Sequence, residues 1–287
     1  MPAEIELRRL TTEDLSAAND LRQAAGWNQT LTDWRRLLAL DPDGCFVAVK
    51  EGRVVGTVTN TSFGLELAWI GMALVDPSQR SQGIGRKLLV KSIEYLQEKK
   101  LHCIKLDATP AGQVLYEKLG FQIEWPLARW MKTEVTVHQA VPNAYAVQSV
   151  KETDWNEVLQ LDLHAFGVSR ESLLRQLGKD SAESVVCRGA DGAMEGFGFL
   201  RTGINADYIG PIVARSEDVG KSITQHLLKT SQRPIFWDIP GPCTAASTWA
   251  TKLGFVSQRP LLRMFMGEND TPGDPQQTWG ISDPATG

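Results

Sequence analysis

An arginine and two glycines make Arg80-Ser-Gln-Gly83-Ile-Gly85 a candidate anion-binding loop. An apolar run from Trp69 to Val75 precedes it and is typical of a buried strand, which Asp76-Pro77 ends. Apolar residues at helical spacing follow from Ile84 to Leu96. The first turn of a helix carries free N–H groups and the positive end of the helix dipole, and glycine lets a ligand approach the backbone. The stretch therefore predicts a strand, a loop and a helix start that bind a phosphate or pyrophosphate.

The spacing of this loop excludes two common nucleotide sites. A dinucleotide fingerprint needs a third glycine three residues after the second, where this chain has Leu88. A nucleoside-triphosphate loop needs a glycine five residues before Gly-Lys-Ser. The chain has Gly220-Lys221-Ser222, but Arg215 stands where that glycine is required.

The remaining pattern, Arg80-x-x-Gly83-x-Gly85 after Leu-Val-Asp-Pro, resembles the pyrophosphate loop of the GNAT superfamily of acetyl-CoA-dependent N-acetyltransferases. A second stretch, from Leu106 to Phe121, resembles the next strand and short helix of that family and ends in its frequent Tyr-x-x-Leu-Gly-Phe. Together and in this order the two motifs are far more specific than either alone. The resemblance implies an α/β fold with a mixed, mostly antiparallel sheet flanked by helices. It also implies acetyl-CoA (coenzyme A) as cosubstrate, without a metal.

The resemblance also implies which residues contact the cofactor. They are Ala73, Leu74 and Val75 of the central strand, Arg80, Ser81, Gln82, Gly83, Ile84, Gly85 and Arg86 of the loop and helix start, and Thr109 and Tyr116 after the next strand. In the family the central strand diverges from its neighbour, and the thioester lies in the gap against main-chain groups. The side chains of the central strand can belong to the core at the same time. Many family members have Asn near the position of Thr109, so it stays open whether Thr109 contacts the cofactor.

Two residues are candidates for proton transfer. By resemblance Tyr116 is the general acid that protonates the departing thiolate, and a phenol with a pKa of about 10 suits this role. The alternative is a tyrosine that packs over the sheet. Glu66, just before the central strand, is the best-placed acidic residue for a general base. The alternative is a solvated residue of the Gly64-Leu-Glu turn.

Aromatic and polar residues near the first helices and the central strand indicate the acceptor site. Trp27, Asn28 and Trp69 lie in these segments, and the chain contains nine tryptophans. An aromatic pocket with a few polar groups suits a small amphipathic or cationic molecule. We therefore expect a small-molecule amine as acceptor.

The second half of the chain repeats the plan of the first. Lys118-Leu-Gly-Phe121 recurs as Lys252-Leu-Gly-Phe255, and Pro126-Leu-Ala-Arg129 recurs at the same separation as Pro260-Leu-Leu-Arg263. Two copies of one fold explain both recurrences.

The repeat predicts four segments. We expect a catalytic, acetyl-CoA-binding domain over residues 1–138, a linker over 139–143 and a degenerate copy of the domain over 144–268. Residues 269–287 then form a tail that is partly docked through Trp279-Gly-Ile281.

The two copies differ where the cofactor should bind. Aligning Leu88-Leu89 with Leu227-Leu228 puts Val219, Ser222 and Thr224 at the positions of Arg80, Gly83 and Gly85, and Ala250 at that of Tyr116. Glu217 and Asp218 add negative charge where a phosphate would lie. We expect the second domain to bind no cofactor and to form a wall of the acceptor pocket.

Composition narrows the class of protein. Lys plus Arg number 30 and Asp plus Glu 34 in 287 residues, so a net charge of -4 without a basic block disfavours a nucleic-acid partner. Cys45, Cys103, Cys187 and Cys243 form no Cys-x-x-Cys pair and are expected to be reduced thiols. No apolar run suggests a signal peptide or a membrane partner. We expect a cytoplasmic monomer or homodimer.

The resulting hypothesis is an N-acetyltransferase (EC 2.3.1.-) that moves the acetyl group of acetyl-CoA to a primary amine by direct attack in a ternary complex. One alternative is a catalytically idle acyl-CoA-binding sensor or scaffold. Another is the transfer of a different acyl group, because the loop recognises only the coenzyme.

Overall fold

The computed structural model describes residues 4–134 and 145–287, so the predicted linker over 139–143 lies outside the described part. The first half contains strands β1 (Ile5–Arg9), β2 (Phe46–Lys50), β3 (Arg53–Phe63), β4 (Leu67–Val75), β5 (Cys103–Ala108) and β6 (Gln122–Lys132). Its helices are α1 (Leu15–Ala24), α2 (Leu31–Leu40), α3 (Ile84–Glu98) and α4 (Pro110–Lys118).

The second half follows the same order of elements, as the sequence repeat predicts. Its strands are β7 (Ala146–Ser149), β8 (Glu183–Arg188), β9 (Met194–Arg201), β10 (Asp207–Ala214), β11 (Ile235–Pro240), β12 (Val256–Gly267) and β13 (Thr278–Gly280). Its helices are α5 (Trp155–Phe166), α6 (Glu171–Asp180), α7 (Glu217–Thr230) and α8 (Thr244–Lys252). Among the described residues, no helix has both the length and the apolar character needed to cross a membrane.

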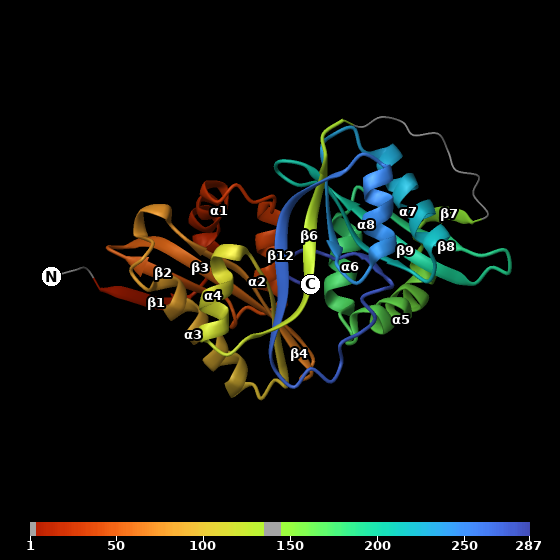
Figure 1. Cartoon of the computed structure of the whole chain (residues 1–287). Coiled ribbons are helices and arrows are strands. Elements are labelled where there is room, and N and C mark those ends of the chain that lie inside the picture. Colours follow the sequence, from red (N-terminus) through yellow and green to blue (C-terminus); the bar gives the residue numbers. More distant parts are fainter. Residues whose placement is uncertain (1–3, 135–144) are drawn as a thin grey trace.

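The strands of both halves form one mixed sheet of 13 strands in the described chain. Twelve follow the order β1-β2-β3-β4-β5-β12-β6-β11-β10-β9-β8-β7, and β13 pairs with β10 outside this row. Strand β12 comes from the second half but lies between β5 and β6 of the first half, antiparallel to both. Strand β6 in turn pairs with β11 of the second half. Figure 1 shows β6 and β12 side by side at the centre of the molecule, between the two bodies. Each half therefore contributes a strand to the sheet of the other: β12 pairs with β5 of the first half, and β6 pairs with β11 of the second.

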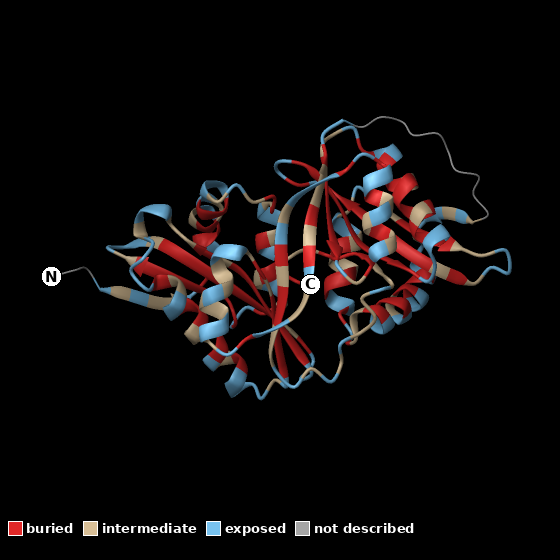
Figure 2. Ribbon diagram, in the orientation of Figure 1, coloured by how far each residue is buried: buried red, intermediate tan, exposed pale blue. Residues whose placement is uncertain are grey.

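Helices cover both faces of the sheet, and the strands between them are buried (Figure 2). In the first half, the apolar face of α3 packs on one face of the sheet through Ile84, Leu88 and Leu96. Helices α1 and α2 cover the opposite face around Leu21 and Trp34. The mixed sheet flanked by helices confirms the expected α/β fold class.

Local sequence explains how individual elements begin and turn. Helix α2 starts with a capping box in which the Thr30 hydroxyl accepts a hydrogen bond from the Asp33 N–H, and the Asp33 carboxylate accepts one from the Thr30 N–H. Between β2 and β3, Glu51 and Gly52 both have positive φ angles, 52° and 74°. Two such residues form the turn that matches the twist of a hairpin.

The C-terminal tail runs from the second half to the first. Strand β13 pairs with β10, and the Ile281 N–H donates to the carbonyl of Asp238 in β11. Farther along, the Pro284 carbonyl accepts a hydrogen bond from the Trp69 indole at 3.1 Å. Ala285 then packs against β4 so closely that a Cβ on Gly71 would lie 2.6 Å from the Ala285 carbonyl oxygen. The tail therefore belongs to the cores of both halves.

Candidate active site

Strands β4 and β5 diverge at the centre of the first half. Their parallel pairing runs from Leu67–Cys103 only to Trp69–Lys105. Beyond it β4 bulges at Met72, which has a φ of 45°, and its register with β3 shifts. The Thr57 hydroxyl donates to the Met72 carbonyl at 2.8 Å and holds the bulge. The divergence that the family resemblance implied is therefore present.

A groove of about 730 Å³ occupies the opening between the diverging strands. Ala73, Leu74 and Val75 line one side, and Arg80, Ser81, Gly83, Ile84, Gly85 and Arg86 line the end formed by the loop and the start of α3. Thr109 and Tyr116 line the side formed by α4. Of the residues expected to contact the cofactor, Gln82 alone is not in this lining. Its side chain accepts a hydrogen bond from Lys50 Nζ at 3.0 Å.

The start of α3 is built to receive an anion. Gly83 precedes the helix in the left-handed region, with a φ of 78°, and no side chain caps the first turn. The N–H groups at Ile84, Gly85 and Arg86 are thus left open at the groove. The backbone does not demand glycine at 85, because a Cβ there would meet only Val75 Cγ2 at 3.6 Å. The missing side chain instead keeps the groove open beside the helix start.

A small inner cavity of about 60 Å³ adjoins the groove. Its lining comes from both halves and from the tail: Trp27, Gln29, Ile70, Gly71, Met72, Ala73, Leu106, Asp107, Thr109, Tyr116, Arg129, Arg259, Leu261, Pro284 and Ala285. Trp27, Ala73, Thr109 and Tyr116 also line the groove. These shared residues form the junction between the two spaces.

Tyr116 stands at this junction on α4. Its ring packs edge-on against Phe121, with ring centroids 6.0 Å apart. Within the described chain no residue hydrogen-bonds with its hydroxyl, which leaves that group available to a ligand. Burial raises the pKa of Tyr116 to about 12, because the charged phenolate is poorly solvated there. The phenol is therefore protonated at neutral pH.

Asp107, at the end of β5, is the acidic residue of the inner cavity. Its fully buried carboxylate accepts two hydrogen bonds from the Arg263 guanidinium, both at 2.9 Å. Burial raises the pKa of Asp107, and the positive charge of Arg263 partly opposes that effect. Arg263 comes from β12, so the second half positions this carboxylate. Sequence reasoning missed Asp107, although a carboxylate inside the buried stretch 103–108 is an unusual residue.

The structure does not bring three of the predicted site residues to the inner cavity. Glu66 is exposed in the turn before β4, about 23 Å along the chain from Ala73 at about 3.3 Å per residue. The Asn28 side chain is engaged with the backbone of Ala206, donating to its carbonyl and accepting from its N–H. Trp69 is buried and supports the tail. The four cysteines are free and buried, as expected.

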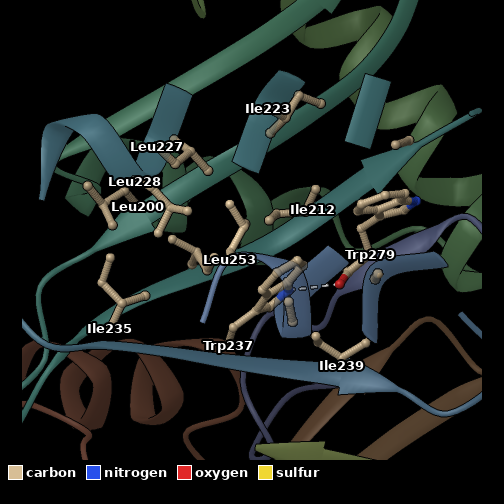
Figure 3. Packing of buried hydrophobic residues seen from close by; sticks show 14 of the residues in the cluster. Leu200, Ile212, Ile223, Leu227, Leu228, Ile235, Trp237, Ile239, Leu253 and Trp279 are labelled. Atoms are coloured by element: carbon tan, nitrogen blue, oxygen red, sulfur yellow. Dashed lines mark hydrogen bonds between the residues drawn. The ribbon is translucent and has the colours of Figure 1, made fainter. Parts of the chain in front are cut away.

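The corresponding opening in the second half is filled by its own chain. Strands β10 and β11 pair only at Asp207 and Tyr208, and β13 pairs with β10 beyond that point. Trp237 Nε1 donates to the Trp279 carbonyl at 2.8 Å (Figure 3). The Trp279 ring lies against α7, where a Cβ on Gly220 would approach it to 2.2 Å.

The start of α7 also differs from that of α3. Helix α3 begins one residue after Gly83 and α7 one residue after Ser216. This comparison corrects the alignment drawn from the leucine pairs, since Ser216 rather than Ser222 takes the place of Gly83. Ser216 Oγ accepts the Val219 N–H, and Glu217 lies in the first helical turn. This helix start is capped and acidic, which disfavours an anion.

Comparisons with known proteins agree with this architecture. Residues 41–123 and residues 158–280 each match a family described as acetyltransferase (GNAT) domain. The uncharacterized N-acetyltransferase YitH of Bacillus subtilis is 30% identical over 87% of both chains. The crystal structure of a putative acetyltransferase from Pyrococcus horikoshii superposes with a TM-score of 0.84, at 24% identity, over 99% of this chain and 96% of the other.

A tandem GNAT protein from the clavulanic acid biosynthesis pathway has a similar fold throughout. Its TM-score is 0.66 at 18% identity, over 98% of this chain and 100% of the other. The chain therefore belongs to the GNAT family of N-acyltransferases and carries two GNAT domains in tandem.

Proposed function

We propose that this protein transfers the acetyl group of acetyl-CoA to the primary amine of a small molecule within a ternary complex. The observation that carries the proposal is the junction at Ala73, Thr109 and Tyr116, which line both the groove and the inner cavity. An acyl thioester laid along the groove reaches the cavity beside the Tyr116 hydroxyl. An acceptor in the cavity approaches the same point from the other side.

The groove suits coenzyme A along its length. The open N–H groups at the start of α3, with Arg80 and Arg86 nearby, suit a pyrophosphate. The strand end at Ala73–Val75, beyond the pairing with β5, offers main-chain groups to an extended amide chain. Bound acetyl-CoA supplies the thioester that the acceptor attacks.

The reaction needs one proton removed and one delivered. The amine nitrogen forms a bond to the carbonyl carbon, the carbon–sulfur bond breaks, and the nitrogen releases a proton. Tyr116 donates a proton or hydrogen bond to the departing sulfur and so stabilises its developing charge. The raised pKa of Tyr116 keeps its proton in place until the sulfur requires it.

Asp107 is our candidate for the group that receives the proton of the amine. It is buried in the inner cavity, and its raised pKa makes it a better proton acceptor than an exposed carboxylate. We expect Asp107→Asn to lower kcat by about 100-fold, since general bases contribute on this order. The measurement is the pH dependence of kcat in the variant. Arg263→Lys is the control, which keeps the carboxylate and a positive charge, and it should retain more activity. Equal activity of Asp107→Asn and wild type would remove this role.

The second half, in this proposal, binds no cofactor. The support is the tail, because β13 and Trp279 occupy the opening between β10 and β11. The second half instead supplies Arg259, Leu261, Pro284 and Ala285 to the inner cavity. Its task is to complete the acceptor site of the first half.

The experiment that tests the function is calorimetric titration with acetyl-CoA, followed by an assay of thiol release over a library of amines. We expect one acetyl-CoA per chain and thiol release that depends on an amine. Two molecules per chain would show that the second half binds as well. Binding without turnover of any amine would favour an acyl-CoA sensor.

A further inference from the structure

Three charged side chains line the inner cavity, and two of them are neutralised by a partner. Asp107 is paired with Arg263 through two hydrogen bonds. Arg129 donates two to the Asp238 carboxylate, at 2.8 and 2.6 Å. The third, Arg259, makes no hydrogen bond or ion pair with any residue in the part of the chain that the structure describes. Of the three, Arg259 thus has no carboxylate of the described chain in hydrogen-bond or ion-pair contact.

The surroundings of Arg259 make this unusual. Its Nε is buried without a hydrogen-bond partner, and on β12 it lies directly across from Arg129 on β6. Burial and the charge of Arg129 lower the pKa of Arg259. Asp238 and Asp283 act on Arg259 electrostatically, but neither carboxylate is in contact with it. Asp238 forms an ion pair with Arg129, and Asp283 accepts hydrogen bonds from the uncharged Gln29 amide. A guanidinium whose Nε is buried without a partner is costly in free energy, so an anion bound to it would remove part of that cost.

A second unsatisfied group faces the same cavity. Gln29 is 6% exposed, and its Oε1 has no hydrogen-bond partner. Its Nε2 donates to both carboxylate oxygens of Asp283 at 3.0 Å, which fixes the orientation of the amide. A buried carbonyl of this kind calls for an N–H or O–H donor. Arg259 and Gln29 thus give the cavity one buried donor and one buried acceptor without hydrogen-bond partners.

We propose that the acceptor is an aminocarboxylate, whose carboxylate binds the Arg259 guanidinium and whose N–H or O–H group reaches Gln29 Oε1. The inference rests on the proposed acetyl transfer. Guanidinium and carboxylate match in geometry and can form two parallel hydrogen bonds. With its carboxylate bound to Arg259, the acceptor can place its amine near Asp107 and Tyr116. The small volume of the cavity, about 60 Å³, favours a compact molecule.

The test compares amino acids with their carboxamides, which differ only in the anionic group, as acceptors for wild type, Arg259→Gln and Arg259→Lys. Aminoalkyl phosphates form a third series. For wild type we expect a higher kcat/KM with the carboxylates. In Arg259→Gln that preference should fall by about 10- to 100-fold, the range for a charge-assisted hydrogen bond. Arg259→Lys should keep part of it. Equal use of acids and amides by wild type, or a clear preference for phosphates, would overturn the carboxylate assignment.

Binding measurements separate this inference from the proposed function. The same amino acids are titrated into wild type and Arg259→Gln in the presence of coenzyme A. Binding that Arg259→Gln abolishes, without turnover in wild type, would support the anion site and contradict acetyl transfer. Turnover of amines with no preference for the carboxylates would support acetyl transfer and contradict the anion site. If wild type neither binds nor acetylates any of the amino acids, the inference is overturned.

Stability provides the matched control. Arg259→Gln should not lower the melting temperature, because the guanidinium has no partner to lose. Arg129→Gln, on the neighbouring strand, should lower it, since Asp238 would then be buried without its partner. An equal loss in both variants would mean that Arg259 is structural and would overturn the inference.

Discussion

Tyr116 and Asp107 divide the proton transfers of the proposed reaction by their environments. The phenol is at the junction of groove and cavity, and burial raises its pKa to about 12. The carboxylate lies deeper, and burial raises its pKa too, against the effect of Arg263. In both residues desolvation disfavours the charged form. One residue thus holds a proton ready for the sulfur, while the other accepts one from nitrogen.

Replacing Tyr116 tests its role as general acid. We expect Tyr116→Phe to lower kcat by about 100-fold, as is usual for a lost general acid. The affinity for acetyl-CoA should change by no more than about 2-fold, because the ring remains. Steady-state kinetics and calorimetric titration measure the two quantities. A variant with full activity would leave the general acid unassigned.

The pH dependence of the rate tests the raised pKa of Tyr116. An ordinary tyrosine loses its proton near pH 10, whereas burial raises the pKa of Tyr116 to about 12. We expect kcat to rise with pH as the amine loses its proton, without an alkaline fall up to about pH 10.5. Circular dichroism at each pH checks that the protein stays folded. A fall with an apparent pKa near 10 would contradict the prediction.

At the scale of elements, the loop before α3 assigns different tasks to its two glycines. Gly83 supplies a backbone conformation, with a φ of 78°, that other residues adopt at a cost of about 1–2 kcal/mol. Gly85 lies within the helix, and a Cβ there would clash with no atom of the protein. Its missing side chain leaves room for a ligand. Folding therefore requires glycine at 83, whereas the proposed binding of a ligand requires it at 85.

Substitutions at the two glycines should separate these requirements. We expect Gly85→Leu to leave the protein at least as stable, since leucine has the higher helix propensity. Its affinity for acetyl-CoA should fall by about 10-fold or more, because the side chain enters the groove. Gly83→Ala should instead lower stability by about 1 kcal/mol, with the smaller loss of affinity. Melting temperature and calorimetry provide the comparison. Unchanged affinity in Gly85→Leu would argue against the groove as the cofactor site.

At the scale of the whole molecule, the exchange of β6 and β12 joins the two halves into one sheet. Strand β12 separates β5 from β6, and it delivers Arg259 and Arg263 to a site otherwise formed by the first half. The tail adds a second connection, from the opening between β10 and β11 to Gly71 in β4. Neither half has a complete sheet alone, so the two should fold as one unit.

Equilibrium unfolding tests this unity. We expect one cooperative transition in urea, with coincident curves from far-UV circular dichroism and tryptophan fluorescence. Leu88→Ala in the first half and Leu227→Ala in the second should each lower the stability of the whole protein by about 2–5 kcal/mol. Two separate transitions, with each substitution affecting only one of them, would contradict the prediction.

The sequence by itself determined the elements, the repeat and the glycine-containing loop before α3, for which we propose phosphate binding. These are local properties, because glycine spacing, capping residues and apolar periodicity act within a few residues of one another. Thus Arg80, Gly83 and Gly85 were identifiable from their spacing, and Tyr116 from the motif after β5. The boundaries at residues 138 and 144 remain a prediction, since they fall outside the described residues.

Only the tertiary structure decided how the inner cavity, the proposed acceptor site, is formed. Asp107, Gln29 and Arg259 are far apart in the chain but line one cavity, and Arg259 reaches it because β12 crosses into the sheet of the first half. Strand pairing between distant segments depends on the packing of the whole sheet, which no short pattern encodes. For the same reason Glu66, close to β4 in sequence, lies outside the inner cavity, whereas Ala285 from the tail lines it.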